Sequence, residues 1–153
     1  MIGLLQRVSR ASVRVDGGVI GEIGPGLLVL LAVEPGDGPA EAERMLERLV
    51  GYRVFPDSAG RMNLSLQDTE GGLLLVPQFT LAADTRKGMR PSFTSAAAPE
   101  QGRRLFEYAV QSARQLLGAR LATGRFGAEM QVDLRNEGPV TFLLHVPPAS
   151  TGA

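Results

Sequence analysis

The sequence predicts an α+β fold: a mostly antiparallel β-sheet, barrel-like in shape, with two main helices. Seven or eight segments have the residue pattern of strands, whereas only two have the pattern of long helices. Neither helix falls regularly between successive strands, which argues against a doubly wound parallel sheet. The 153 residues are the size of one domain. We assign this single domain to residues 1–146 and expect residues 147–153 to be a disordered tail.

Strand signals dominate the first third of the chain. A strand at residues 11–15 and another at 19–23 flank Asp16-Gly17-Gly18, whose glycines can adopt the positive φ that a tight hairpin needs. After a second break at Gly24-Pro25-Gly26, residues 27–33 form a continuous apolar run. Such a run predicts a strand that is buried on both faces.

The first helix is predicted from Pro39 to about Gly51, because proline suits the first helical turn and the apolar residues recur on one face. The second is predicted from Pro99 to about Gly118 on the same grounds. Between them, turns are expected at residues 57–60 and 71–72, a short buried strand at 73–76 and an exposed loop at 86–91. Two last strands are expected at 128–135 and 140–146, separated by a turn at 136–139.

The composition excludes several kinds of chemistry. The chain has no cysteine, which rules out disulfides, thiolate metal sites and a cysteine nucleophile. Its one histidine, His145, cannot form a histidine cluster for a metal, and we interpret it as a strand-end residue without a special task. We therefore expect no cofactor and no metal. The 16 basic and 16 acidic residues balance, and we attribute the excess of arginine over the single lysine to codon usage. No apolar run is long enough to span a membrane and no signal peptide is evident, so we expect a cytoplasmic protein without a membrane partner.

Two segments stand out as possible sites of chemistry. Pro77-Gln78-Phe79-Thr80 directly follows a buried strand, and its proline cannot donate to a sheet. The strand should therefore end there, leaving the following backbone amides free to point into a cleft. The second segment is the predicted turn Asn136-Glu137-Gly138-Pro139 with Val140-Thr141. Each segment alone is better explained by a purely structural role, as a kinked strand with a core phenylalanine and as a turn.

Taken together, these segments resemble the D-aminoacyl-tRNA deacylase family, also called D-tyrosyl-tRNA deacylases. That family carries an S-Q-F-T motif and a G-P-V-T motif, which stand here as Pro77–Thr80 and Gly138–Thr141. Further similar stretches follow in family order across residues 1–146. They are Gln6-Arg7-Val8, Arg10-Ala11-Ser12-Val13, Gly51-Tyr52-Arg53, Met62-Asn63-Leu64, Leu81-Ala82-Ala83-Asp84-Thr85, Gly88-Met89-Arg90-Pro91-Ser92-Phe93 and Thr123-Gly124-Arg125-Phe126.

The resemblance implies a homodimer that hydrolyses the ester between a D-amino acid, or glycine, and the acceptor end of tRNA. In the family the Gly-Pro bond is cis and reaches into the partner's site, so Gly138 and Pro139 are expected to bind substrate and to exclude L side chains. Arg7 is expected to hold the Gly-Pro bond in its orientation. Gln78, Phe79 and Thr80 are the expected catalytic residues, with backbone amides holding the oxyanion and the tRNA 2′-hydroxyl assisting. Thr80 is expected to position the substrate instead of attacking it.

Pro77 departs from the family pattern, because it replaces the usual serine and removes a hydroxyl and an N–H at a position expected to bind substrate. A related animal-type deacylase subfamily carries proline there and tolerates some L-amino acids. The loop residues Arg86, Lys87 and Arg90 are expected to contact tRNA, and no DNA partner is expected. Arg103 and Arg104 are candidates for the same contact.

Three other functions remain open from the sequence. The chain could be a related hydrolase with another substrate, a tRNA-binding module without activity, or a metal-dependent enzyme that uses carboxylates. Hydrolysis of D-aminoacyl-tRNA that persists in the presence of a chelator would separate the deacylase from all three.

Overall fold

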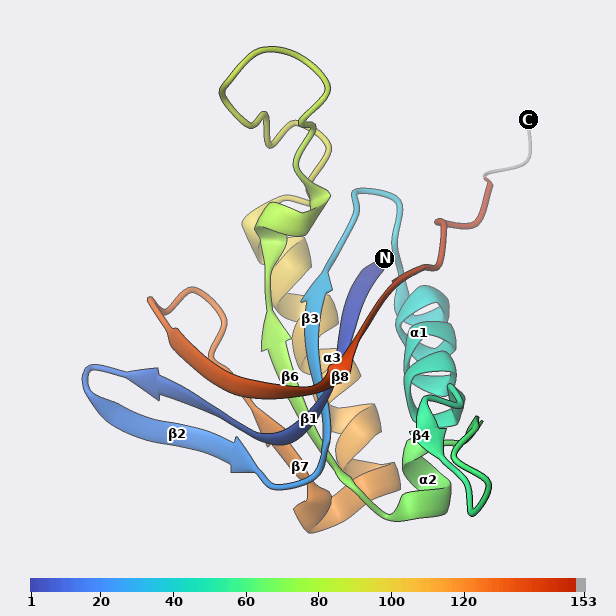
Figure 1. Ribbon diagram of the computed structural model, residues 1–153. Helices are drawn as coiled ribbons and strands as arrows, with labels where there is room; N and C mark the ends of the chain where they lie inside the picture. Colours follow the sequence, from blue (N-terminus) through green and yellow to red (C-terminus); the bar gives the residue numbers. More distant parts are fainter. Residues whose placement is uncertain (151–153) are drawn as a thin grey trace.

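A six-stranded sheet with two long helices packed on one face forms the body of the molecule, as Figure 1 shows for the computed structural model. The structure describes residues 1–150. The strands of the sheet are β1 (Ile2–Val15), β2 (Gly18–Ile23), β3 (Gly26–Ala32), β6 (Gly72–Pro77), β7 (Leu121–Thr123) and β8 (Gln131–His145). The helices are α1 (Pro39–Gly51) and α3 (Pro99–Leu117). The predicted α+β class with two main helices is confirmed.

The long first strand organises the sheet. β1 pairs antiparallel with β3 through its first half and with β2 through its second half, while β8 runs antiparallel along its other side. β6 then adds to β3, and β7 to β6, both in parallel. The sheet is therefore mixed, with antiparallel pairs on β1 and parallel pairs beyond β3.

The sheet curls until its two ends nearly meet. Its order is β2-β1-β3-β6-β7, and at the closing edge a Cβ on Gly21 of β2 would lie 2.7 Å from the carbonyl oxygen of Thr123 in β7. Only a residue without a side chain allows this approach of the two backbones. The barrel-like shape predicted from the sequence follows from this near closure.

Two apolar clusters fill the two faces of the curled sheet. The larger one joins β1, β3 and β6 to α1 and α3, with Leu5, Leu27 and Leu73 fully buried. The smaller one lies inside the curl and contains Val13, Leu28 and Leu74. β3 and β6 contribute alternate residues to both clusters, which explains their continuous apolar sequences.

Some predicted boundaries were wrong. β1 begins at Ile2, nine residues before the predicted Ala11, because its first half pairs with both β3 and β8. The two strands predicted at 128–135 and 140–146 are one strand, β8, whose pairing with β1 shifts register on both sides of Val8. These irregularities let the strand pass through residues 136–139 without ending.

The shorter elements lie outside the six-stranded sheet. The predicted turn at residues 57–60 joins the short strands β4 (Phe55–Pro56) and β5 (Met62–Leu64). α2 (Leu66–Thr69) was not predicted, although Ser65 and Asp68 form the reciprocal capping pair that marks a helix start. Two 3₁₀ turns complete the elements: η1 (Phe79–Ala82) and η2 (Gly118–Arg120).

The α-amino group of Met1 is buried in a polar cluster. It lies 2.7 Å from Oε2 of Glu34 and 2.9 Å from Oδ1 of Asp37, and donates to the carbonyl of Val146 at 2.6 Å. The Nε2 atom of His145 lies 2.7 Å from the same Glu34 oxygen. Burial opposes the ionisation of Glu34, but hydrogen bonds from the α-amino group and His145 outweigh it and lower its pKa. The cluster fastens the start of β1 to the end of β8.

Residues 146–150 pass the first turn of α1. The backbone N–H of Ala149 donates to Oε1 of Glu41 at 3.0 Å, and residues 146–150 belong to no helix or strand. Residues 151–153 of the predicted disordered tail lie outside the described residues. In the part of the chain that the structure describes, no helix is long and apolar enough to cross a membrane.

Replacing Asp37 with Asn should lower the free energy of unfolding by about 3 kcal/mol, because the buried ammonium group would lose a fully buried partner. Asp133→Asn is the control, since Asp133 is 71% exposed and only 3.9 Å from Arg14, and it should change stability by less than about 1 kcal/mol. Urea unfolding of the three proteins measures both effects. Equal stability of the two variants would contradict the role given to Asp37.

Candidate active site

The chain leaves the sheet at Pro77, as the sequence predicted. Pro77 is the last residue of β6 and lies opposite Leu31 of β3. The next residue, Gln78, makes the last bond to the sheet, with its N–H donating to the carbonyl of Leu31 at 2.8 Å. The 3₁₀ turn η1 starts directly afterwards.

The N–H groups of Phe79 and Thr80 point to no carbonyl within this turn. The first backbone bond of η1 runs from the N–H of Leu81 to the carbonyl of Gln78, at 3.3 Å, and the two preceding N–H groups come before it. The opening N–H groups of any helical turn lack an earlier carbonyl. Two adjacent backbone donors are therefore available to bind a negatively charged oxygen.

The Thr80 hydroxyl is exposed and has an amide beside it. Nε2 of Gln78 donates to Oγ1 of Thr80 at 2.5 Å, and within residues 1–150 no other side chain bonds this hydroxyl. The Gln78 amide nitrogen is a donor and cannot remove the hydroxyl proton. The arrangement orients Thr80 but does not activate it as a nucleophile.

A hollow of about 440 Å³ opens beside Gln78 and Phe79. Apolar and aromatic side chains dominate its lining, and β6, α3 and the segment between β7 and β8 all contribute. They include Val76, Pro77, Phe106, Phe126, Met130 and Val132. Hollows with an apolar lining and a few polar groups at one side commonly take small molecules or single nucleosides. Pro77 lies in the wall, and the residue that replaces the expected serine therefore borders the space where a ligand would sit.

Phe79 forms an exposed aromatic pair with Phe93. The ring centroids lie 5.2 Å apart with an interplanar angle of 58°, and the Phe79 side chain is 56% exposed. Asp84 and Ser92 close the intervening loop by a pair of backbone bonds of 2.7 and 3.0 Å. This loop projects beyond the sheet at the top of Figure 1.

The three loop cations predicted to contact tRNA are all exposed but differ in their partners. Arg86 forms a bidentate pair with Asp84, at 2.9 Å from Nε to Oδ1 and 2.8 Å from Nη2 to Oδ2. Hydrogen bonds from Arg86 hold the pKa of Asp84 well below its usual range. Lys87 and Arg90 take part in no ion pair of the described chain. These two cations of the loop are therefore available to an anionic partner.

The second predicted segment is a sharp bend within β8. The peptide bond between Gly138 and Pro139 is cis, and Gly138 has a φ of +136°. A Cβ at Gly138 would lie 2.6 Å from Cγ2 of Val140 and 3.2 Å from Nη2 of Arg7. Both the backbone angle and the crowding require glycine at this position.

Two side chains hold this bend. Arg7 donates from Nε to the carbonyl of Glu137 at 3.0 Å and from Nη1 to the carbonyl of Val54 at 2.7 Å. The Asn136 side chain accepts from the N–H of Val140 at 2.7 Å and donates to Oγ1 of Thr141 at 2.8 Å. Arg7 thus contacts the bend from β1, while Asn136 closes it from within β8.

The structure does not bring the two segments together within one chain. Gly138 and Pro139 do not line the hollow beside Gln78 and Phe79. Pro77 of β6 lies opposite Leu31 of β3, and Leu31 lies opposite Gly3 of β1. Gly3 in turn lies opposite Leu144 of β8, which is five residues beyond Pro139. The exposed bend therefore does not border the hollow beside this chain's own Phe79.

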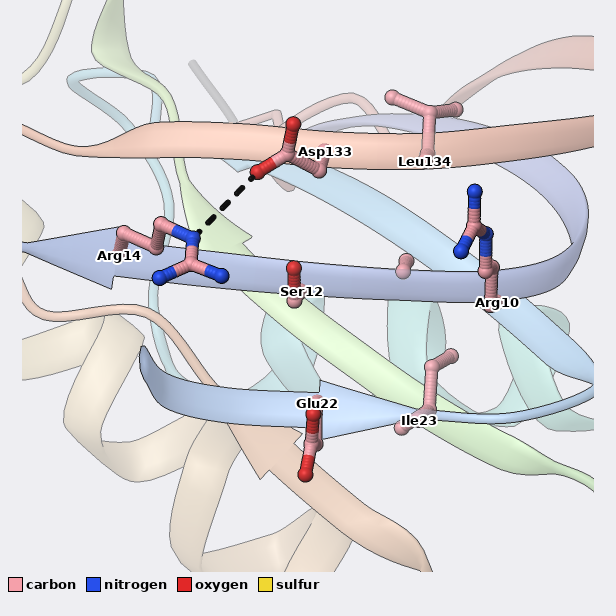
Figure 2. Close-up of a pocket in the computed structure, with 8 residues that line it drawn as sticks. Arg10, Ser12, Arg14, Glu22, Ile23, Asp133 and Leu134 are labelled. Atoms are coloured by element: carbon pink, nitrogen blue, oxygen red, sulfur yellow. Dashed lines mark ion pairs between the residues drawn. The ribbon is translucent and has the colours of Figure 1, made fainter. Parts of the chain in front are cut away.

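A separate hollow of about 440 Å³ lies on the ribbon of β1, β2 and β8, and Figure 2 shows its lining. An ion pair of 3.9 Å joins Arg14 and Asp133 across it. None of the predicted site residues lines it. Within residues 1–150, no three His, Cys, Asp or Glu side chains come together in a group that could hold a metal ion.

Several residues of the candidate site were not singled out from the residue pattern. Phe106 lies on α3, whereas Phe126 and Met130 lie between β7 and β8, and only the packing of α3 against the sheet brings them together beside Gln78. Phe93 and Phe126 lie in stretches that resembled the deacylase family, which was the available signal. The hydrogen-bonding role of Asn136 had no sequence signal beyond its place before Gly138.

Comparisons with known proteins identify the family of this chain. The family model described as D-Tyr-tRNA(Tyr) deacylase matches residues 4–145. A protein of Methylococcus capsulatus named D-aminoacyl-tRNA deacylase is 66% identical over 148 residues, covering 97% of this chain and 96% of its own length. One of Nitrosococcus oceani with the same name is 63% identical over 149 residues, covering 97% of this chain and 96% of its own length.

Two solved structures share the fold. One is described as a c-Myc DNA unwinding element binding protein and has a TM-score of 0.92 at 38% identity, covering 96% of this chain and 99% of its own. The other, described as a probable eukaryotic D-amino acid tRNA deacylase, has a TM-score of 0.84 at 18% identity over 94% of this chain and 97% of its own. With a family model that spans nearly its whole length and relatives above 60% identity, this chain belongs to the D-Tyr-tRNA(Tyr) deacylase family.

Proposed function

We propose that this protein hydrolyses the ester of D-aminoacyl-tRNA and of glycyl-tRNA in the cytoplasm, releasing the amino acid and free tRNA. The observation that carries this proposal is the pair of N–H groups at Phe79 and Thr80, which donate to no group within residues 1–150 and lie beside an apolar hollow. Ester hydrolysis passes through a tetrahedral oxyanion, and preorganised backbone donors stabilise that charge. The names of the relatives in Methylococcus and Nitrosococcus support the same substrate class.

The protein supplies no general base of its own in this mechanism. The hydroxyl of Thr80 is held by the amide of Gln78, and the sequence contains no cysteine and no histidine other than His145. His145 lies at the far end of β8, beside Glu34. The 2′-hydroxyl of the terminal tRNA nucleoside therefore assists the attacking water, and the protein binds, orients and stabilises the charge.

The chirality of the substrate is selected by the bend at Gly138 and Pro139 of a second subunit. The exposed bend lies away from its own chain's Phe79 and Thr80, which suits insertion into the site of a partner in a homodimer. Main-chain atoms of the bend occupy the side that an L side chain would need, and selection works by steric rejection. Glycine has no side chain to reject and is accepted.

The acceptor end of the tRNA reaches this site past the loop of residues 84–92. Lys87 and Arg90 contact its phosphates, because no ion pair in the described chain engages them. Arg86 has a smaller part than the sequence suggested, since Asp84 already occupies its guanidinium group on two sides.

Single-turnover hydrolysis of matched D-Tyr-tRNA and L-Tyr-tRNA in the presence of a chelator tests the proposal. We expect rapid loss of the D form, sparing of the L form and no effect of the chelator. Loss of both forms would contradict the proposed chirality and favour a relaxed pocket bordered by Pro77. If neither form is hydrolysed, Pro77→Ser decides whether proline at this position abolished the activity or the substrate is a different one.

Replacing Thr80 with Val should reduce kcat for D-Tyr-tRNA by about tenfold or less, because only an orienting hydrogen bond is lost. A nucleophilic hydroxyl would instead cost on the order of 10⁴-fold. Thr94→Val is a control on the same exposed surface, and it should leave kcat unchanged. Rapid-quench measurement of the chemical step separates the two expectations.

Replacing Gly138 with Ala should lower kcat/KM for D-Tyr-tRNA by at least about tenfold and narrow the D-to-L ratio, because the added Cβ would press on Val140 and Arg7. Gly60→Ala also adds a Cβ at a residue with positive φ, +80°, but this Cβ would meet no atom within 4 Å. That control should lose some thermal stability and keep the full D-to-L ratio. An unchanged ratio in the Gly138 variant would remove the bend from the selection of chirality.

A further inference from the structure

A second, more polar hollow adjoins the apolar one beside Gln78. It has a volume of about 330 Å³ and shares Phe106 and Phe126 with its neighbour. The aromatic rings of Phe106 and Phe126 lie 6.4 Å apart between centroids and separate the two spaces. Beyond them, the second hollow is lined by the charged and polar side chains of Arg103, Glu107, Gln111, Thr123 and Arg125.

Arg103 is held in place without losing its hydrogen-bonding capacity. Its guanidinium carbon lies 5.1 Å from the centroid of the Phe126 ring. Stacking on an aromatic face orients a guanidinium group while its N–H edges remain free to donate. Both Arg103 and Arg125 are exposed, and neither takes part in an ion pair within residues 1–150.

The charge of the hollow favours an anion, but only moderately. Glu107 follows Arg103 by one turn of α3 and lines the same space, so that two cations face one carboxylate. No ion pair of the described residues joins Glu107 to either arginine. A planar guanidinium fork matches the two free oxygens of a phosphodiester.

We propose that Arg103 and Arg125 bind the phosphodiester backbone of the tRNA 3′ end, next to the terminal nucleoside. This inference rests on the proposed function, in which the terminal nucleoside and its acyl group occupy the apolar hollow beside Gln78 and Phe79. A polynucleotide that leaves this hollow past Phe126 carries its first phosphodiester into the space beside Arg103. The N-terminal part of α3 and the β7–β8 segment thereby form a binding site for RNA backbone, distinct from the loop of residues 84–92.

The test compares substrates with and without phosphodiesters. Arg103→Met keeps an unbranched apolar chain on Phe126 and removes the charge. We expect about a tenfold increase in KM for D-Tyr-tRNA, with kcat within about twofold, because a charge-assisted contact to phosphate is lost. For 3′-O-D-tyrosyl-adenosine, which has no phosphodiester, KM and kcat should equal those of the unmodified protein.

Two control variants sharpen the comparison. Arg114→Met removes the same charge from another exposed residue of α3, which lines neither hollow, and should leave KM unchanged. Glu107→Gln removes the carboxylate that repels an anion and should lower KM for D-Tyr-tRNA severalfold. If Arg114→Met raises KM as much as Arg103→Met, the effect is one of overall charge and the inference is overturned.

A binding experiment keeps this inference separate from the proposed activity. The probe is an RNA hairpin with a single-stranded 3′ end that terminates in adenosine, and fluorescence anisotropy measures its Kd at several salt concentrations. Arg103→Met should weaken binding about tenfold and reduce the slope of log K against log salt concentration by about 1. Unchanged Kd and slope would overturn the inference even if D-Tyr-tRNA is hydrolysed. Failure of hydrolysis with the expected change in Kd would instead reject the proposed function and retain the binding site.

Discussion

The burial of β3 and β6 on both faces is the constraint on which the rest of the structure depends. Each strand is a nearly continuous run of aliphatic residues, and water must be excluded from both sides. Helices α1 and α3 cover one face, and the other face is covered by the curl of the same sheet. A flat sheet would leave Leu28 and Leu74 exposed, so the near contact of β2 with β7 is a consequence of the apolar sequence of these central strands.

The same constraint creates the candidate active site at the point where β6 ends. Because proline cannot extend the hydrogen-bonded ladder, the chain leaves the sheet at Pro77. The apolar hollow opens at this end of β6. The site therefore combines an apolar wall from the core with backbone donors that the end of the strand leaves unpaired. Such a site needs few chemically special side chains, which fits a sequence without cysteine and with a single histidine.

Pairing of β1 with β8 produces the other functional segment. β8 runs through its bend without breaking, since Arg7 and Asn136 bond the backbone groups that the sheet ladder does not reach there. The bend is exposed and remote from Phe79 and Thr80 of the same chain. In one chain the two segments of the proposed site do not border the same hollow, and this separation supports the proposal of a second copy.

The local sequence determined where many elements begin and end. Pro39 and Pro99 open the two long helices as predicted, Pro77 ends β6, and the apolar run at 27–33 is a strand buried on both faces. These outcomes depend on properties of single residues and short periods, which act wherever the segment lies in the fold. The family resemblance linked two distant motifs that no local pattern connects. The comparisons confirmed the family.

Only the tertiary structure decided what depends on contacts between distant residues. β8 is one strand instead of two because its partner β1 continues beside it through the predicted turn. Asp84 neutralises Arg86, whereas Arg103 stacks on Phe126 with its N–H groups available to a ligand. The sequence alone does not distinguish these two arginines. A sequence states which charges and rings are present, but the distances between them, and hence which are available to a ligand, are set by the packing of α3 and the strands.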